Sequence, residues 1–66
     1  MDRRRIELQI RIVVVTYRVE QRRDFPTMEV FRGRARRLLD GLHQAVRPYP
    51  DLQARLNEAR EELDRA

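Results

Sequence analysis

The stretch from Ile6 to Glu20 constrains the fold of this 66-residue chain more than any other. β-Branched residues dominate it, and such side chains lose rotamer freedom in a helix but pack well on a pleated sheet. Apolar residues occupy its even positions through Val14, and polar residues occupy its odd positions through Arg11. This alternation is typical of a half-buried strand, so the sequence predicts one long strand over about residues 5–21.

No other segment has the pattern of a second strand. A lone strand leaves its backbone N–H and C=O groups unpaired, which is costly where they are buried. A chain of this size buries only about 60% of its unfolded surface, and it has no cysteine for a disulfide. We therefore expect the strand to pair, parallel or antiparallel, with that of a second copy in a homodimer or larger homo-oligomer. The predicted interface residues are Ile6, Leu8, Ile10, Ile12, Val13, Val14, Val15, Tyr17 and Val19.

Two amphipathic helices are predicted in the rest of the chain. The segment 24–27 contains a proline that cannot continue a β-ladder, and Thr27 is a good N-cap for a helix over about residues 27–47. Two further prolines end that helix, and Asp51 is expected to cap a second helix over about residues 51–65. The short link between the helices implies an antiparallel helical hairpin.

These elements predict an α+β fold in a single domain of residues 1–66. The protomer is a small β-α-α unit whose N-terminal strand pairs between subunits, with the helical hairpin packed on the shared sheet. A first helix that ends at Gly41 is the alternative, but the apolar stripe continues beyond that residue. The predicted shared core comprises Leu8, Ile10, Ile12, Val14, Phe31, Leu38, Leu42, Leu52, Leu56 and Leu63.

The sequence offers almost no enzymatic machinery. It lacks serine, cysteine and lysine, and its two glycines lack the spacing of a phosphate-binding loop. The single histidine, His43, falls on the polar face of the first predicted helix with Asp40 one turn before it. Two such pairs would have to meet in a dimer to bind a metal, so a solvated histidine is the simpler interpretation. We expect no enzymatic activity, metal, cofactor or small-molecule substrate.

The longest uninterrupted apolar run extends from Ile12 to Val15. It is far too short to span a bilayer. We therefore expect a soluble, cytoplasmic protein without a membrane partner.

All fifteen basic residues are arginine, and they are unevenly distributed. Residues 1–37 carry eleven arginines and five acids, a net charge of +6, whereas residues 38–66 carry four arginines and six acids, a net charge of −2. A basic first half is typical of proteins with an anionic partner, although a solvated arginine-rich surface gives the same pattern. Exclusive use of arginine is expected either from a GC-rich genome or from a designed sequence.

The strand–helix–helix order resembles, in topology only, that of ribbon–helix–helix regulators, whose two-stranded ribbon enters the major groove of DNA. The resemblance implies a polar reading face on the strand, here Glu7, Gln9 and Arg11, because glutamine and arginine can read adenine and guanine edges. The candidate contacts to DNA or RNA are Arg3, Arg4, Arg5, Gln9, Arg11, Arg22 and Arg23.

The sequence supports two functional hypotheses. The leading one is a non-enzymatic, self-assembling homo-oligomeric module, either a designed oligomer or a small structural or adaptor protein. The alternative is a basic nucleic-acid-binding regulator.

Overall fold

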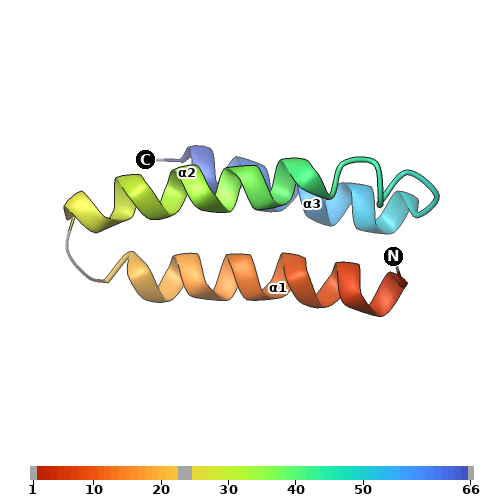
Figure 1. Ribbon diagram of the computed structural model, residues 1–66, viewed down its shortest axis with the longest axis horizontal. Coiled ribbons are helices and arrows are strands. Elements are labelled where there is room, and N and C mark those ends of the chain that lie inside the picture. The colour runs from red at the N-terminus through yellow and green to blue at the C-terminus, as the bar shows by residue number, and fades with distance from the viewer. Residues whose placement is uncertain (1, 23–24, 66) are drawn as a thin grey trace.

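Three α-helices make up the part of the chain that this computed structural model describes, which is residues 2–22 and 25–65, with the side chains of 25–28 excepted. The helices are α1 (Arg3–Glu20), α2 (Phe25–Gly41) and α3 (Pro50–Asp64). They form a bundle 37 Å long and 17 × 15 Å across. Helices α1 and α3 run in the same direction, and α2 runs antiparallel to both (Figure 1).

The predicted α+β fold is wrong, because the stretch assigned to a strand is helix α1. None of the described residues forms a strand, so the intermolecular β-sheet predicted from that stretch is wrong as well. In an α-helix the backbone N–H groups bond to carbonyls four residues earlier. Helix α1 therefore has no row of unpaired strand amides that requires a second copy. The fold is an all-α three-helix bundle.

Several residues at the start of this stretch and within it favour a helix. Asp2 is the N-cap of α1, and its side chain accepts a hydrogen bond of 3.2 Å from the backbone N–H of Arg4. Arg3 and Glu7, four residues apart, form an ion pair of 3.3 Å on the helix surface. No glycine or proline interrupts residues 3–20. β-Branched residues cost only a few tenths of a kcal/mol each in a helix, so packing against two other helices outweighs their preference for strands.

Helix α1 contributes one stripe to the core of the bundle. Its buried residues repeat at steps of four, three and four: Ile6, Ile10, Val13 and Tyr17. Later parts of the chain supply the other buried residues: Ala35, Leu39, Leu42, Val46, Leu52, Leu56, Ala59 and Leu63. The three helices therefore share one hydrophobic core within a single copy of the chain.

Three members of the predicted core lie outside it. Leu8, Ile12 and Leu38 are 54%, 53% and 60% exposed. The physical reason for the first two is the period of the backbone, because a helix with 3.6 residues per turn does not point alternate residues to one side. The other predicted core residues are buried, except Val14 and Phe31, which pack against the core while partly exposed.

Helix α2 starts earlier and ends earlier than predicted, at Phe25 and Gly41. Pro26 lies inside its first turn, where a proline is tolerated because the first N–H groups of a helix have no intrahelical partner. Thr27, the predicted N-cap, is therefore also helical. Residues 42–48 form turns held by backbone hydrogen bonds, most of them between residues three apart. The buried stripe continues through these turns without a regular helix.

Candidate interaction surface on helix α1

Helix α1 carries a second apolar stripe on the side that faces away from the core. Its residues, which we call the outer stripe, are Leu8, Ile12, Val15 and Val19, with exposed fractions of 54%, 53%, 50% and 50%. They repeat at the same steps as the buried residues of α1, but each lies two positions later, a rotation of about 200°. Helix α1 is therefore apolar on two nearly opposite sides, of which α2 and α3 cover one.

The nine residues predicted as an oligomer interface divide between these two sides. Four of them face the core of their own protomer: Ile6, Ile10, Val13 and Tyr17. Val14 packs half-buried against that core. The remaining four are the outer stripe, which stays accessible to a partner. The steps of four and three between Leu8 and Val19 are the sequence signal for this stripe, which a two-residue period conceals.

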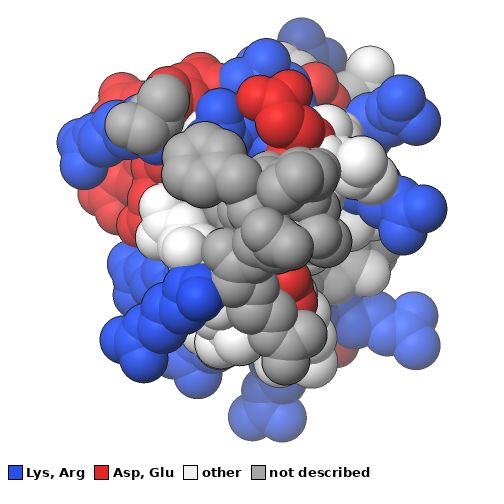
Figure 2. Space-filling view, turned by 90° about the vertical axis from the view of Figure 1, so that its left-hand side faces the viewer, with Lys and Arg blue, Asp and Glu red and all other residues white. Residues whose placement is uncertain are grey.

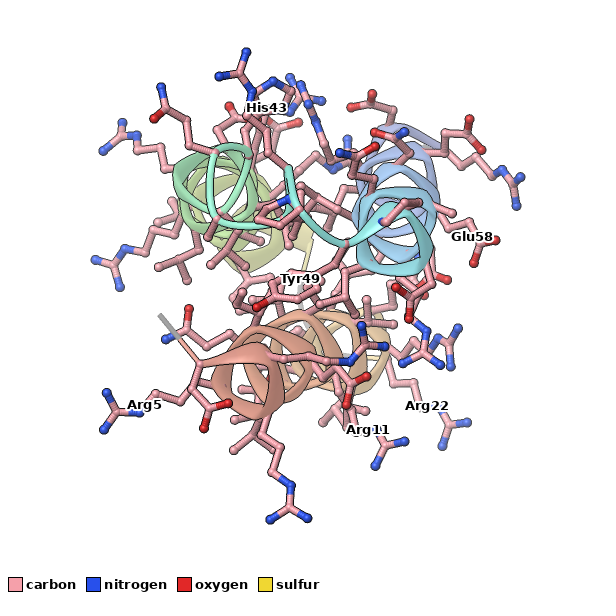
Figure 3. All side chains as sticks on the ribbon, turned by 90° about the vertical axis from the view of Figure 1, so that its right-hand side faces the viewer. Arg5, Arg11, Arg22, His43, Tyr49 and Glu58 are labelled. Carbon is pink, nitrogen blue, oxygen red and sulfur yellow. The ribbon has the colours of Figure 1, made fainter. Side chains whose placement is uncertain are left out.

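Arginines border the outer stripe. Arg4 and Arg11 lie on the edge nearer α3, where they line a groove with residues of that helix. Figure 3 shows Arg5 projecting from the opposite side of α1, with Arg22 on the same side as Arg11. At 100° per residue, no aspartate or glutamate of α1 falls within about 90° of the centre of the stripe. The exposed side of α1 is thus apolar along its middle and basic along its edges.

Two other arginines of α1 are held by carboxylates of α3. Arg3 donates hydrogen bonds to both carboxylate oxygens of Asp51, one of them at 3.1 Å, and another to Glu7 at 3.3 Å. Arg18 donates to Glu62 at 3.1 and 3.0 Å. These side-chain hydrogen bonds raise the pKa of both guanidinium groups and lower the pKa of Asp51 and of Glu62. The prediction that Asp51 caps α3 is wrong, because the N-cap is Tyr49 and Asp51 lies in the first turn, where it ties α3 to α1.

Charge segregates between the helices. Helix α1 has five arginines and two glutamates, a net charge of +3, whereas α3 has two arginines and five carboxylates, a net charge of −3. Figure 2 shows acidic side chains gathered over α3 at the upper left and basic ones over α1 below and α2 to the right. Further ion pairs join α2 to α3, such as Arg60 with Asp40 at 3.2 Å. The acidic half of the chain thus neutralises part of its basic half.

Four arginines of the α1 region form no ion pair with any residue that the structure describes: Arg4, Arg5, Arg11 and Arg22. All four are exposed. Glu7, which lies one turn from both Arg4 and Arg11, is paired with Arg3 and Arg55 instead, so no described ion pair holds any of the four guanidinium groups.

A groove of about 530 Å³ runs between α1 and α3 beside the outer stripe. Its apolar lining includes Leu8, Val15 and Ala59. The charged side chains along it are Arg4, Arg11, Arg18, Arg55, Glu7, Glu58 and Glu62. Four arginines against three glutamates leave little net charge, so the groove lacks the single-sign field that concentrates a polyanion. The groove instead widens the surface that a partner packed on the outer stripe would contact.

The seven candidate nucleic-acid contacts do not form one reading face. The resemblance to ribbon–helix–helix regulators is wrong, because it requires a strand where the structure has α1. Gln9 and Arg11 are about 200° apart around a helix, so they project in different directions. Glu7 turns toward α3, where Arg55 lies 3.7 Å away. Arg3 is engaged by carboxylates, and Arg23 lies outside the described residues.

His43 and Asp40, the pair considered as metal ligands from the sequence, have no metal-binding arrangement among the described residues. His43 is exposed on the connection that follows α2 (Figure 3). Asp40 is engaged with Arg60. Over residues 2–22 and 25–65, no group of three or more His, Cys, Asp or Glu side chains could hold a metal ion.

Comparisons with protein-family models, curated proteins and solved structures found no match to this chain. Among the described helices, none has the length and apolar character needed to cross a membrane. The functional conclusion therefore depends on the exposed side of α1.

Proposed function

We propose that the protein is a non-enzymatic module that self-associates by packing the outer stripe of α1 against the outer stripe of a second copy. The supporting observation is a row of four half-exposed aliphatic side chains at heptad spacing. Two helices interdigitate through rows with this spacing. Because the two stripes of a pair are identical in length and chemistry, a second copy is a matching partner. A cytoplasmic location, expected from the sequence, stays a prediction.

The width of the outer stripe favours a helix over a flat surface as the partner. At 100° per residue, its four side chains fall within an arc of about 60°. Such a narrow stripe is typical of a helix–helix seam, whereas a helix that lies on a bilayer presents a broader apolar face. Contacts to a nucleic-acid backbone would leave the stripe exposed to water.

The expected association is weak and reversible. Burying the exposed half of a Val, Leu or Ile side chain contributes about 1 kcal/mol, so the eight such side chains of a pair contribute about 8 kcal/mol. Association costs at least about 4 kcal/mol in lost translational and rotational freedom. The difference is at most about 4 kcal/mol, so we expect a dissociation constant of about a millimolar.

The direct test is the double variant Ile12→Gln with Val15→Gln. Glutamine keeps a good helix propensity but removes the aliphatic contact. In sedimentation equilibrium, the wild-type mass is expected to rise with concentration from 8.0 kDa toward twice that value. The variant is expected to stay monomeric with an unchanged helical circular dichroism spectrum, because both side chains lie outside the core.

The matched control is Val30→Gln with Leu38→Gln on α2, since these side chains are 59% and 60% exposed. It removes as much exposed aliphatic surface without touching α1, so we expect it to associate like the wild type. A wild-type protein that stays at 8.0 kDa at millimolar concentration contradicts the proposal. So does a control that dissociates as completely as the α1 variant.

Nucleic-acid binding is a second candidate function, favoured by the four exposed arginines that have no described carboxylate partner: Arg4, Arg5, Arg11 and Arg22. A titration of mixed-sequence duplex DNA, followed by fluorescence anisotropy at several salt concentrations, tests it. Micromolar binding that weakens steeply with salt would support a backbone-directed contact. Absence of binding at low salt would eliminate this candidate.

A further inference from the structure

The outer stripe continues into arginine at both ends. Arg5 lies three residues before Leu8, and Arg22 lies three residues after Val19. At 100° per residue, Arg5 lies about 50° to one side of the centre of the stripe and Arg22 about 50° to the other, so each end of the aliphatic stripe is flanked by an arginine on one edge. Both arginines are exposed, and neither forms an ion pair with a residue that the structure describes.

Any packing of two outer stripes brings these end arginines together. In a parallel pair, the two Arg5 side chains lie at one end of the contact, on opposite edges of it, and the two Arg22 side chains lie likewise at the other end. In an antiparallel pair, each Arg5 lies at the same end as the Arg22 of the other copy, on the opposite edge. Because like charges meet at both ends in either direction, the arginines oppose association whatever the orientation of the pair.

The protomer offers little to neutralise these charges. Arg3 and Arg18, elsewhere on α1, are held by Asp51 and Glu62 of α3. The side of α1 that bears the outer stripe has no carboxylate within about 90° of its centre. The charge that pairing brings together must therefore be neutralised from outside the protomer.

We propose that an oligophosphate promotes self-association by bridging the Arg5 and Arg22 guanidinium groups of the two copies. This inference rests on the proposed self-association. A guanidinium group binds phosphate through two parallel N–H donors, and a chain of phosphates can hold several such groups. A ligand that binds the pair more tightly than the single copy shifts the equilibrium toward the pair. Inorganic polyphosphate and a nucleic-acid backbone both supply this chemistry.

Sedimentation equilibrium in sodium tripolyphosphate and in sodium chloride at equal ionic strength tests the proposal. Equal ionic strength gives the two solutions the same general screening. Because only tripolyphosphate can bridge the arginines of a pair, we expect association to be about tenfold tighter in it than in chloride. Arg5→Gln with Arg22→Gln should associate more tightly than the wild type in chloride and should not respond to tripolyphosphate. Arg34→Gln with Arg37→Gln, the matched control on α2, should keep the wild-type response.

The outcomes separate this inference from the proposed function. Wild-type protein that pairs in chloride but no more tightly with tripolyphosphate or with a short DNA duplex overturns the bridging role and leaves self-association intact. If neither the wild type nor the Arg5 and Arg22 variant associates in either salt, the proposed function itself is overturned. Larger aggregates that also form with the Ile12 and Val15 variant overturn the bridging role, because the arginines would then be cross-linked without the stripe.

A second arm of the same experiment replaces tripolyphosphate with a short DNA duplex. A discrete pair that forms with tripolyphosphate, with the duplex or with both supports the proposal and identifies the source of the phosphate. Failure of both probes to tighten the pairing overturns it.

Discussion

At the scale of single residues, Tyr17 shows a polar group buried at a cost. Its side chain is 1% exposed and stacks with Phe31, with ring centroids 6.4 Å apart. Its buried hydroxyl has no hydrogen-bond partner among the residues that the structure describes. Leaving such a group without a partner costs about 1–3 kcal/mol.

Tyr17→Phe is therefore expected to leave stability unchanged or to raise the free energy of unfolding by up to about 1 kcal/mol. Urea denaturation followed by circular dichroism measures the change. Tyr17→Leu, which loses the ring contact with Phe31, is expected to be destabilising and serves as the comparison. A loss of more than about 1 kcal/mol in the phenylalanine variant would show that the hydroxyl makes a stabilising hydrogen bond.

Arg3 joins the N-terminal ends of α1 and α3. It bonds to Asp51, and its guanidinium carbon lies 5.4 Å from the centre of the Tyr49 ring. Because Arg3 lowers the pKa of Asp51 in the folded state, the pair stabilises the fold above the unfolded pKa of aspartate, about 4, and this contribution is lost as pH falls through the lower folded value. Arg18 likewise lowers the pKa of Glu62, so the contribution of this pair to stability is also lost as pH falls.

Thermal unfolding measured from neutral to strongly acid pH tests this linkage. The melting temperature is expected to fall as the solution becomes more acid than about pH 4. Asp51→Asn should melt lower than the wild type at neutral pH and should lose less on acidification. If the two proteins show parallel pH profiles, Asp51 does not contribute through its charge.

At the scale of elements, α1 shows what its sequence could and could not predict. Ile6 and Ile10 fit both a two-residue and a 3.6-residue period, so the first half of the stretch is ambiguous. From Val13 onward the odd positions are also apolar. A strand with one buried face does not explain this pattern, whereas a helix with two apolar stripes does. Whether this stretch forms a strand or a helix depends on what it packs against, and this chain supplies two amphipathic helices rather than a second strand.

The candidate interaction surface was predictable in position but not in detail. The predicted interface residues all lie on α1, yet only the helical period separates the outer stripe from the core. Sequence alone also does not show that Arg3 and Arg18 are engaged, because their partners lie more than forty residues away and meet them only in the packed bundle. For the same reason, the sequence does not predict that carboxylates of α3 form ion pairs with arginines of α1.

Helix α2 contains a glycine where an alanine would fit. Gly33 is exposed, has no positive φ, and a Cβ added there would meet nothing within 4 Å. Gly33→Ala is therefore expected to raise the free energy of unfolding by about 0.5–1 kcal/mol, since glycine has more backbone entropy to lose in a helix. Urea denaturation provides the measurement. A decrease would mean that the glycine serves a close contact absent from this structure.

At the scale of the whole molecule, the net charge of +4 hides an internal division. Acidic α3 neutralises part of basic α1 and α2 through ion pairs at both ends of the bundle. Part of the remaining positive charge borders the outer stripe, and part lies on α2. Because one copy already buries a shared core, a partner on this stripe would add contacts to a folded protein rather than complete its fold.

The central claim is that the outer stripe, not the core side of α1, meets a second copy. Isotope-filtered NMR on an equal mixture of labelled and unlabelled protein tests this most directly, because it records only contacts between copies. We expect intermolecular contacts from the methyl groups of Leu8, Ile12, Val15 and Val19 and none from those of Ile6, Ile10 and Val13. Intermolecular contacts from the buried set, or a dimeric sample without contacts from the outer stripe, would contradict the claim.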